Sequence, residues 1–177
     1  MAAMKPLCIT FAGVPGSSKS IIAHFLSERF SLPIYSTDNI RFEVREDMLA
    51  ASIHDPGVLD EFKRRAKMRE DELIAEKKTY IMDGSVDRRW VELRSKLLAR
   101  GYRWFLIDME LTPTFLQELY EETGRHEAVE QLSTYLGQHE TFMAEYAADI
   151  NLYIRDKDFK HRTILAERAL RDFIGDK

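Results

Sequence analysis

The feature that most constrains this chain is a glycine-containing segment, Gly13-Val14-Pro15-Gly16-Ser17-Ser18-Lys19-Ser20. It follows the apolar run Leu7–Ala12, which is typical of a strand buried on both faces. It precedes apolar residues at helical spacing, namely Ile21, Ile22, Phe25 and Leu26. A strand, a glycine turn and a helix in this order direct the turn toward a ligand beyond the carboxyl end of a parallel sheet. The segment therefore predicts an α/β fold with a ligand site at this turn.

The segment has the residues of a phosphate-binding loop, with one substitution. The usual pattern is Gly, four residues, Gly, Lys and then Ser or Thr, and Ser18 stands where the second glycine is expected. Gly13 and Gly16 let backbone amides approach phosphate oxygens closely. Lys19 adds a positive charge at a helix N-terminus, and Ser20 is expected to bind magnesium. The loop thus predicts binding of ATP and Mg²⁺, with an ordinary strand-to-helix turn as the competing interpretation.

Length and composition predict a single domain spanning residues 1–177. The chain has 177 residues, is 45% hydrophobic and carries a formal net charge of −4, which gives no bias toward nucleic acid or membrane. Its one cysteine, Cys8, lies in the first expected strand, so we expect a core residue and no disulfide within the chain. The sequence shows no zinc-type ligand spacing, signal peptide or membrane-length apolar stretch. We expect a cytoplasmic protein that is a monomer or a weak homodimer.

Strands and helices are expected to alternate along the chain, which favours a parallel sheet covered on both faces. After the first strand, the expected strands are 33–37, 80–82, 103–107 and 150–154. Apolar spacing predicts a helix over 39–50, and a turn at 55–57 separates it from a long charged helix that ends near Thr79. Further helix boundaries are expected at Gly101, Thr112-Pro113 and Gly124.

Two acidic residues that follow expected strands are alternative candidates for binding magnesium. Asp83 follows the strand 80–82 and precedes Gly84, at a position where a carboxylate could hold magnesium through water. An ordinary Asp-Gly turn is the alternative interpretation of this pair. Asp108 likewise follows the strand 103–107. Both residues are therefore candidates for the metal site, and the sequence alone does not rank them.

A carboxylate and a guanidinium follow the second expected strand. Asp38 and Arg41 are three residues apart, so they are expected to share one helical face near the sheet edge. In phosphoryl transfer a carboxylate can accept the proton of the acceptor hydroxyl, and an arginine can hold an anion. The alternative is that Asp38 caps the helix and Arg41 is solvated.

Three segments together resemble a known group of enzymes. Residues 13–20, 36–41 and 81–84 are similar to the successive signatures of small P-loop kinases of the AAA_33 and polynucleotide-kinase-like, zeta-toxin-like type. The resemblance covers nearly the whole chain. It implies a three-layer P-loop NTPase fold with a five-stranded parallel sheet in the order 2-3-1-4-5 and a helical lid.

The same resemblance implies roles for individual residues. Lys19 and Ser20 would serve ATP and magnesium, and Asp83 would match the Walker B acid. Asp38 would match the substrate-activating carboxylate, and Arg41 the arginine on the substrate side.

The expected lid, residues 111–148, has an unusual charge for a segment that should face ATP. Its one base is Arg125, which is either a catalytic arginine for the transferring phosphate or a surface residue. The histidines His126 and His139 could assist in the same region, but solvated helix residues are the favoured interpretation. The acids of the segment are Glu118, Glu121, Glu122, Glu127, Glu130, Glu140 and Glu145.

Other basic residues have open roles. Arg88 and Arg89 follow Asp83-Gly84-Ser85, where they could bind an anionic acceptor or lie in solvent. Arg155 follows the last expected strand and could border the adenine, with a surface charge as the alternative. The basic run 63–69 is interpreted as a solvated helix face.

These patterns predict an ATP-dependent phosphotransferase that moves the γ-phosphate of Mg-ATP to a hydroxyl group. The acceptor is expected to be a small molecule or a nucleoside- or nucleotide-type compound, and a nucleic-acid end is less favoured. The alternative is a non-catalytic or weakly hydrolytic ATP-binding regulatory module. Ser18 and the acidic lid motivate that alternative.

Overall fold

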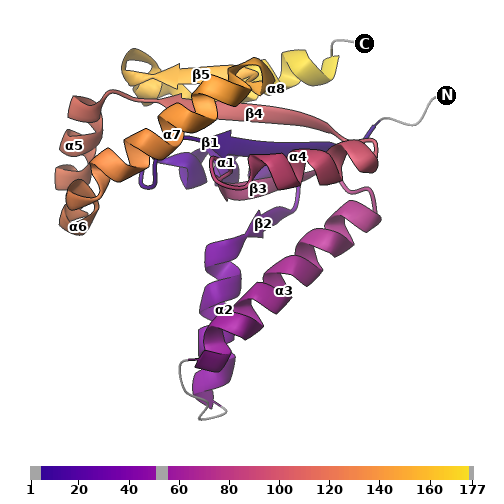
Figure 1. Ribbon diagram of the computed structural model, residues 1–177. Coiled ribbons are helices and arrows are strands. Elements are labelled where there is room, and N and C mark those ends of the chain that lie inside the picture. Colours follow the sequence, from indigo (N-terminus) through magenta and orange to yellow (C-terminus); the bar gives the residue numbers. More distant parts are fainter. Residues whose placement is uncertain (1–4, 51–55, 176–177) are drawn as a thin grey trace.

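The centre of the molecule is a parallel sheet of five strands in the order β2-β3-β1-β4-β5, the order that the resemblance to small P-loop kinases implies (Figure 1). The computed structural model describes residues 5–50 and 56–175. The strands are β1 (Leu7–Ala12), β2 (Ile34–Ser36), β3 (Tyr80–Ser85), β4 (Arg103–Glu110) and β5 (Leu152–Arg155). Because β1 is the middle strand and is buried on both faces, the loop that follows it emerges at the centre of the sheet edge.

Helices cover both faces of the sheet and produce the expected three layers. On one face, α1 (Lys19–Phe30) and α8 (Arg162–Gly175) pack on a core that includes Ile9 and Phe11. On the other face, α4 (Trp90–Ala99) and α7 (Leu132–Tyr146) pack on a core that includes Cys8. Neighbouring residues of β1 therefore point to opposite layers, as strand geometry requires. The prediction that Cys8 is a core residue is confirmed.

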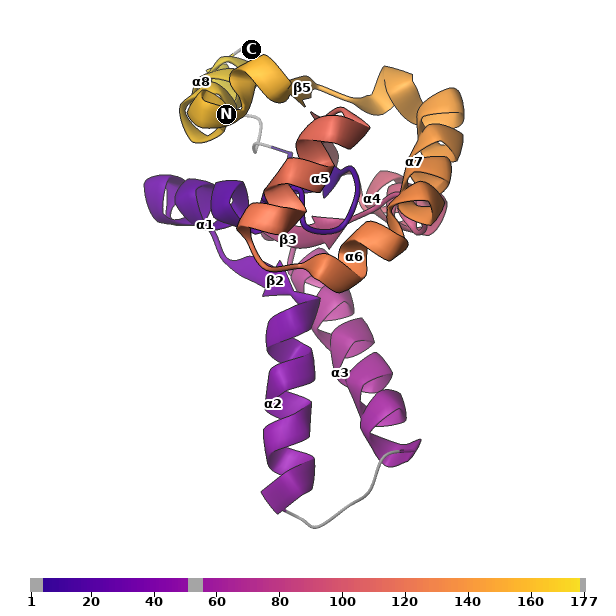
Figure 2. The ribbon, with the colours of Figure 1, turned by 90° about the vertical axis from the view of Figure 1, so that its left-hand side faces the viewer.

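Two long helices form an arm that extends away from the sheet. They are α2 (Thr37–Ala50) and α3 (Pro56–Ala75), which run side by side in both ribbon views (Figures 1 and 2). Ile40, Val44 and Ile74 anchor the base of this arm in the core. Asp55, part of the turn expected between the helices, lies outside the described residues.

A helical segment connects β4 to β5 and packs against the body of the protein. It consists of α5 (Pro113–Glu122), α6 (His126–Glu130), α7 and the short 3₁₀ helix η1 (Ala147–Asp149). Leu116, Tyr120, Leu132 and Phe142 of this segment are buried in the two cores. A second 3₁₀ helix, η2 (Asp156–His161), follows β5.

Capping residues set several helix ends as predicted. The Thr112 side chain accepts a hydrogen bond from the Phe115 amide at 3.3 Å, so Thr112 is the N-cap of α5. Gly101 and Gly124, with φ angles of 74° and 68°, follow the ends of α4 and α5. The helix α3 ends at Ala75 rather than near Thr79, because Lys77 turns into the left-handed region with φ 53°.

The strands differ from their expected bounds where pairing with a neighbour decides their length. Strand β3 continues through Asp83 because Ser36 of β2 pairs with it, and β4 continues through Asp108 because it also pairs with β5. Both acids therefore lie inside strands rather than after them. Strand β5 starts at Leu152 because η1 occupies residues 147–149. Among the residues described, no helix has the length and apolar character needed to cross a membrane.

Candidate active site

The segment 13–20 includes the loop between β1 and α1. Residues of α5 and of the turn that follows α5 lie against this loop (Figure 2). Gly16 has φ 80°, and a β-carbon there would lie 2.8 Å from the Tyr120 ring and 3.3 Å from the Arg125 guanidinium. The Tyr120 hydroxyl also donates a hydrogen bond to the Pro15 carbonyl. Only glycine fits this position. Because Gly16 has no side chain, Arg125, the one arginine of the segment 111–148, lies directly against the loop.

Ser18 adopts the backbone conformation that explains why a glycine is usual at its position. Its φ is 72° and its ψ is 22°, which is the left-handed region. A side chain in this region costs about 1 kcal/mol or more relative to glycine. The loop therefore keeps its geometry despite the substitution, at a cost in folding free energy.

Lys19 points back into the loop and is almost fully buried. Its Nζ donates hydrogen bonds to the Gly13 carbonyl at 2.8 Å, to the Val14 carbonyl, and to Ser17 Oγ at 3.0 Å. Burial lowers the pKa of the Lys19 ammonium to about 8, against the opposing effect of nearby carboxylates. A buried positive charge inside a ring of glycines and backbone groups suits a polyphosphate chain, so this loop fits ATP.

Ser20 and Asp83 meet beside the loop. Ser20 Oγ donates a hydrogen bond to Asp83 Oδ1 at 2.8 Å. A hydroxyl and a carboxylate are the oxygen ligands that Mg²⁺ takes alongside phosphate oxygens, so this pair fits the metal that accompanies ATP. The described residues contain no group of three or more His, Cys, Asp or Glu side chains that could hold a metal by themselves. Asp108, the competing candidate, instead contacts His139.

Asp38 and Arg41 lie at the start of α2, close in sequence to the end of β2. The Asp38 side chain is 89% exposed and lies 3.9 Å from the Arg41 guanidinium. Arg41 also stacks over the Phe62 ring, with 4.9 Å to the centroid. The helix begins at Thr37, and the Asn39 amide donates to Ser36 Oγ at 3.4 Å. The capping position therefore belongs to Ser36, and Asp38 is not needed for it.

The other predicted arginines have different surroundings. Arg89 donates a hydrogen bond to Glu70 on α3, whose carboxylate is buried and also accepts one from Lys96 at 3.0 Å. Arg88 is exposed. Arg155 Nε donates to Glu110 at 2.5 Å on the protein surface. The roles of these three arginines in binding an acceptor or adenine stay predictions.

Sequence reasoning missed two residues near the loop. Asp87 accepts hydrogen bonds from the Gly13 amide at 3.0 Å and from Ser85 Oγ at 2.6 Å. His139, interpreted as solvated, is instead mostly buried, with Nδ1 2.9 Å from Asp87 and Nε2 3.3 Å from Asp108. The interpretation of His139 was wrong because it ignored helical position: His139 precedes the buried Phe142 by three residues, which places both on one face of α7.

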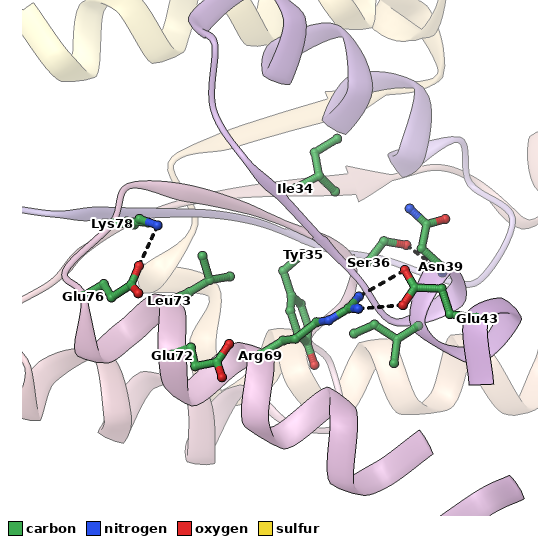
Figure 3. A pocket seen from close by; sticks show the side chains of 11 residues that line it. Ile34, Tyr35, Ser36, Asn39, Glu43, Arg69, Glu72, Leu73, Glu76 and Lys78 are labelled. Atoms are coloured by element: carbon green, nitrogen blue, oxygen red, sulfur yellow. Dashed lines mark hydrogen bonds and ion pairs between the residues drawn. The ribbon is translucent and has the colours of Figure 1, made fainter. Parts of the chain in front are cut away.

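A separate cavity of about 420 Å³ lies at the base of the arm (Figure 3). It is lined by residues of β2, α2 and α3 and of the turn before β3, among them Ser36, Asn39, Glu43 and Arg69. No residue of the loop 13–20 lines it. The cavity is therefore distinct from the phosphate loop.

Comparison with known proteins defines the fold. No protein-family model matches the chain, and no curated protein matches its sequence. Solved structures do match it. A gluconokinase from Sinorhizobium meliloti 1021 is 17% identical, with a TM-score of 0.65 over 97% of this chain and 95% of that one. A shikimate kinase from Aquifex aeolicus VF5 is 14% identical, with a TM-score of 0.53 over 96% of this chain and 97% of that one.

A third similar structure comes from the PezAT chromosomal toxin–antitoxin system of Streptococcus pneumoniae. It is 13% identical, with a TM-score of 0.58 over 89% of this chain and 70% of that one. The chain has the fold of small P-loop kinases. The narrower resemblance to the AAA_33 and zeta-toxin-like group stays a prediction.

Proposed function

We propose that this protein is a phosphotransferase that moves the γ-phosphate of Mg-ATP to a hydroxyl group of a small molecule. The observation that carries the proposal is the arrangement of the loop, in which the Lys19 ammonium is held inside the glycine turn and Ser20 contacts Asp83. Two similar structures are named as kinases of small molecules, which supports the same class of reaction. The formal net charge of −4 favours a small acceptor over a nucleic-acid end.

Each residue has a defined part in the proposed reaction. Lys19 and the loop amides hold the phosphates, and Ser20 with Asp83 would hold Mg²⁺, which neutralises phosphate charge when bound. Asp38 accepts the proton of the acceptor hydroxyl as that oxygen bonds to the γ-phosphorus. The bond from the γ-phosphorus to the bridging oxygen breaks, and ADP leaves. Arg125, which lies against Gly16, stabilises the charge of the transferring group.

The acceptor would bind between the loop and the start of α2. Asp38 is exposed and lies near Arg41, so an acceptor with an anionic group could pair with this arginine while its hydroxyl meets the carboxylate. Arg88, which follows β3, is a further exposed arginine. These residues favour hydroxylated, anionic small molecules such as hydroxy acids and phosphorylated compounds.

The test is a phosphoryl-transfer assay with Mg-ATP and a panel of hydroxyl acceptors. Lys19→Ala should abolish nucleotide binding, and Asp38→Asn should abolish transfer while nucleotide binding persists. Glu46→Gln changes an exposed acid on the same helix and serves as the matched control, with activity like the wild type. Wild-type protein that binds Mg-ATP, transfers phosphate to no panel member and turns ATP over equally with Asp38→Asn would favour the regulatory alternative.

A further inference from the structure

Three ionisable side chains from distant parts of the chain meet behind the phosphate loop. They are Asp87, just after β3, Asp108 on β4 and His139 on α7. The His139 ring lies between the two acids, with Nδ1 2.9 Å from Asp87 Oδ2 and Nε2 3.3 Å from Asp108 Oδ1. We call this group the Asp87–His139–Asp108 cluster.

The cluster is shielded from water, so its charges must be balanced within the protein. The exposed fraction of the side chain is 0% for Asp108, 8% for Asp87 and 12% for His139. Within the described chain, neither carboxylate oxygen of Asp108 has a hydrogen-bond donor. The basic side chain that forms an ion pair with this acid is His139. A buried carboxylate without a positive partner is costly, so the imidazole is the group that compensates Asp108.

The surroundings favour the charged form of the imidazole. Burial alone would lower the pKa of His139, but the attraction of Asp108 and Asp87 outweighs burial and raises it to about 9. Burial raises the pKa of Asp108, whereas His139 and other hydrogen-bond donors hold the pKa of Asp87 below its usual range despite burial. The histidine therefore supplies one positive charge to two acids.

The cluster is joined directly to the loop. The second oxygen of Asp87, Oδ1, accepts a hydrogen bond from the Gly13 amide at 3.0 Å. Both acids are close enough to Lys19 to affect the pKa of its ammonium. Without the charge on His139, two carboxylates would face any polyphosphate that enters the loop, and like charges repel strongly where water is excluded.

We propose that His139 is a positioning residue for nucleotide binding, which neutralises Asp87 and Asp108 behind the loop and keeps Asp87 on the Gly13 amide. The inference rests on the proposed function, since it requires that the loop bind a nucleotide polyphosphate. Because His139 comes from α7, seating of this helix contributes to the affinity of the loop for its ligand.

A mutant series tests the proposal through the dissociation constant of Mg-ATP, measured by isothermal titration calorimetry at pH 7.5. His139→Gln should raise this constant about tenfold, the effect expected when one buried negative charge behind the loop is left uncompensated. Asp108→Asn combined with His139→Gln should restore it to within about threefold of wild type, because the second negative charge is gone. His24→Gln, the same change at an exposed site on α1, is the control and should leave affinity unchanged.

Rescue separates a charge role from a packing role. Affinity of His139→Gln equal to wild type, or a folded double variant that stays as weak as His139→Gln, would overturn the proposal. If circular dichroism shows that His139→Gln does not fold, the single variant Asp108→Asn decides: it should bind Mg-ATP at least as tightly as wild type, and weaker binding refutes the inference.

Lys19→Ala distinguishes failure of the proposed function from failure of the proposed role of His139. If it binds Mg-ATP as well as wild type, the proposed function itself fails. If it loses binding while His139→Gln does not, only the role of His139 fails.

Discussion

The phosphate loop and the α2–α3 arm differ in how far their charged side chains are exposed to solvent. Around the loop, Lys19 and His139 are buried, and each contacts several partners. Along the arm, ion pairs such as Arg69 with Glu43 lie on the surface, and Asp38 is 89% exposed. If the proposed function is correct, the nucleotide side of the site is arranged before binding, whereas the acceptor side is completed by its ligand.

The largest effect should come from Arg125, which lies against Gly16 and which we propose as the catalytic arginine. We expect Arg125→Ala to lower the transfer rate about a thousandfold, because a correctly placed arginine stabilises the charge of the transferring phosphoryl group. The dissociation constant of Mg-ATP should change less than about tenfold. Steady-state kinetics and calorimetry measure the two effects. Arg168→Ala, an exposed change on α8, is the control, and equal activity of both variants would remove Arg125 from the mechanism.

The second effect concerns Glu70, a buried charge at the base of the arm. Its carboxylate accepts hydrogen bonds from Arg89 and Lys96, so Glu70→Ala leaves two positive charges without this partner. Since both cations are about one-third exposed, we expect a loss of about 2 kcal/mol in the free energy of unfolding, below the usual range for a fully buried pair.

The matched control for Glu70 is Glu43→Ala on the same arm. Glu43 pairs with Arg69 at the surface, so its loss should cost less than about 1 kcal/mol. Urea unfolding at pH 7 compares the two variants. Equal losses would show that the buried carboxylate of Glu70 contributes no more to stability than the surface carboxylate of Glu43.

The pH dependence of nucleotide binding tests the buried charge of Lys19. Its pKa is lowered to about 8, so Mg-ATP affinity should fall as pH rises above 8, by up to about tenfold per unit. Loss of the proton of His139, whose pKa is raised to about 9, acts in the same direction. Calorimetry between pH 7 and pH 9.5 measures the slope, and a flat profile would contradict a charged Lys19 as the phosphate ligand.

The contribution of Lys19 to stability without ligand should respond to pH with the opposite sign. Because the folded pKa of Lys19 lies below its ordinary value of 10.5, the unfolded chain binds more protons between pH 8 and 10.5. The contribution of Lys19 to the free energy of unfolding therefore rises with pH in this window. Lys19→Met should remove that contribution, and urea unfolding of both proteins across the window measures it.

The smallest effect should come from Ser18, whose backbone is in the left-handed region. Ser18→Gly should raise the free energy of unfolding by about 1 kcal/mol and preserve or tighten Mg-ATP binding. Thermal unfolding with and without Mg-ATP measures both quantities. Ser31→Gly, at a second left-handed serine that lies after α1 and away from the loop, should stabilise the protein without altering nucleotide affinity.

Local sequence patterns were sufficient to predict the loop and most helix ends, and the resemblance to small P-loop kinases implied the strand order. The strand Leu7–Ala12 has the bounds that its apolar run predicts, and the next helix starts at Lys19 as expected. Patterns could not predict which charges are buried, because these depend on contacts between distant parts of the chain. Glu70 lies in a charged run yet is buried, since Arg89 reaches it from 19 residues away.

The same limit applies to the candidate site. His139 and Asp87 are 52 residues apart, and no spacing in the sequence links them. The ranking of Asp83 over Asp108 also required tertiary structure, because both follow apolar runs and only the fold brings Asp83 to Ser20. The need for glycine at Gly16 arises from Tyr120, more than a hundred residues later.

Hydrogen bonds hold the helix α5 near both of its ends, and these bonds restrict how the site can open. At its start, Thr112 donates hydrogen bonds to Asp156 at 2.9 Å and 2.6 Å, and near its end Tyr120 donates to Pro15 of the loop. Lifting α5 as a rigid rod would break these bonds, whereas a rotation at Gly124 leaves them intact. We therefore expect any motion that opens the site to occur in the residues after Gly124, while α5 stays against the loop.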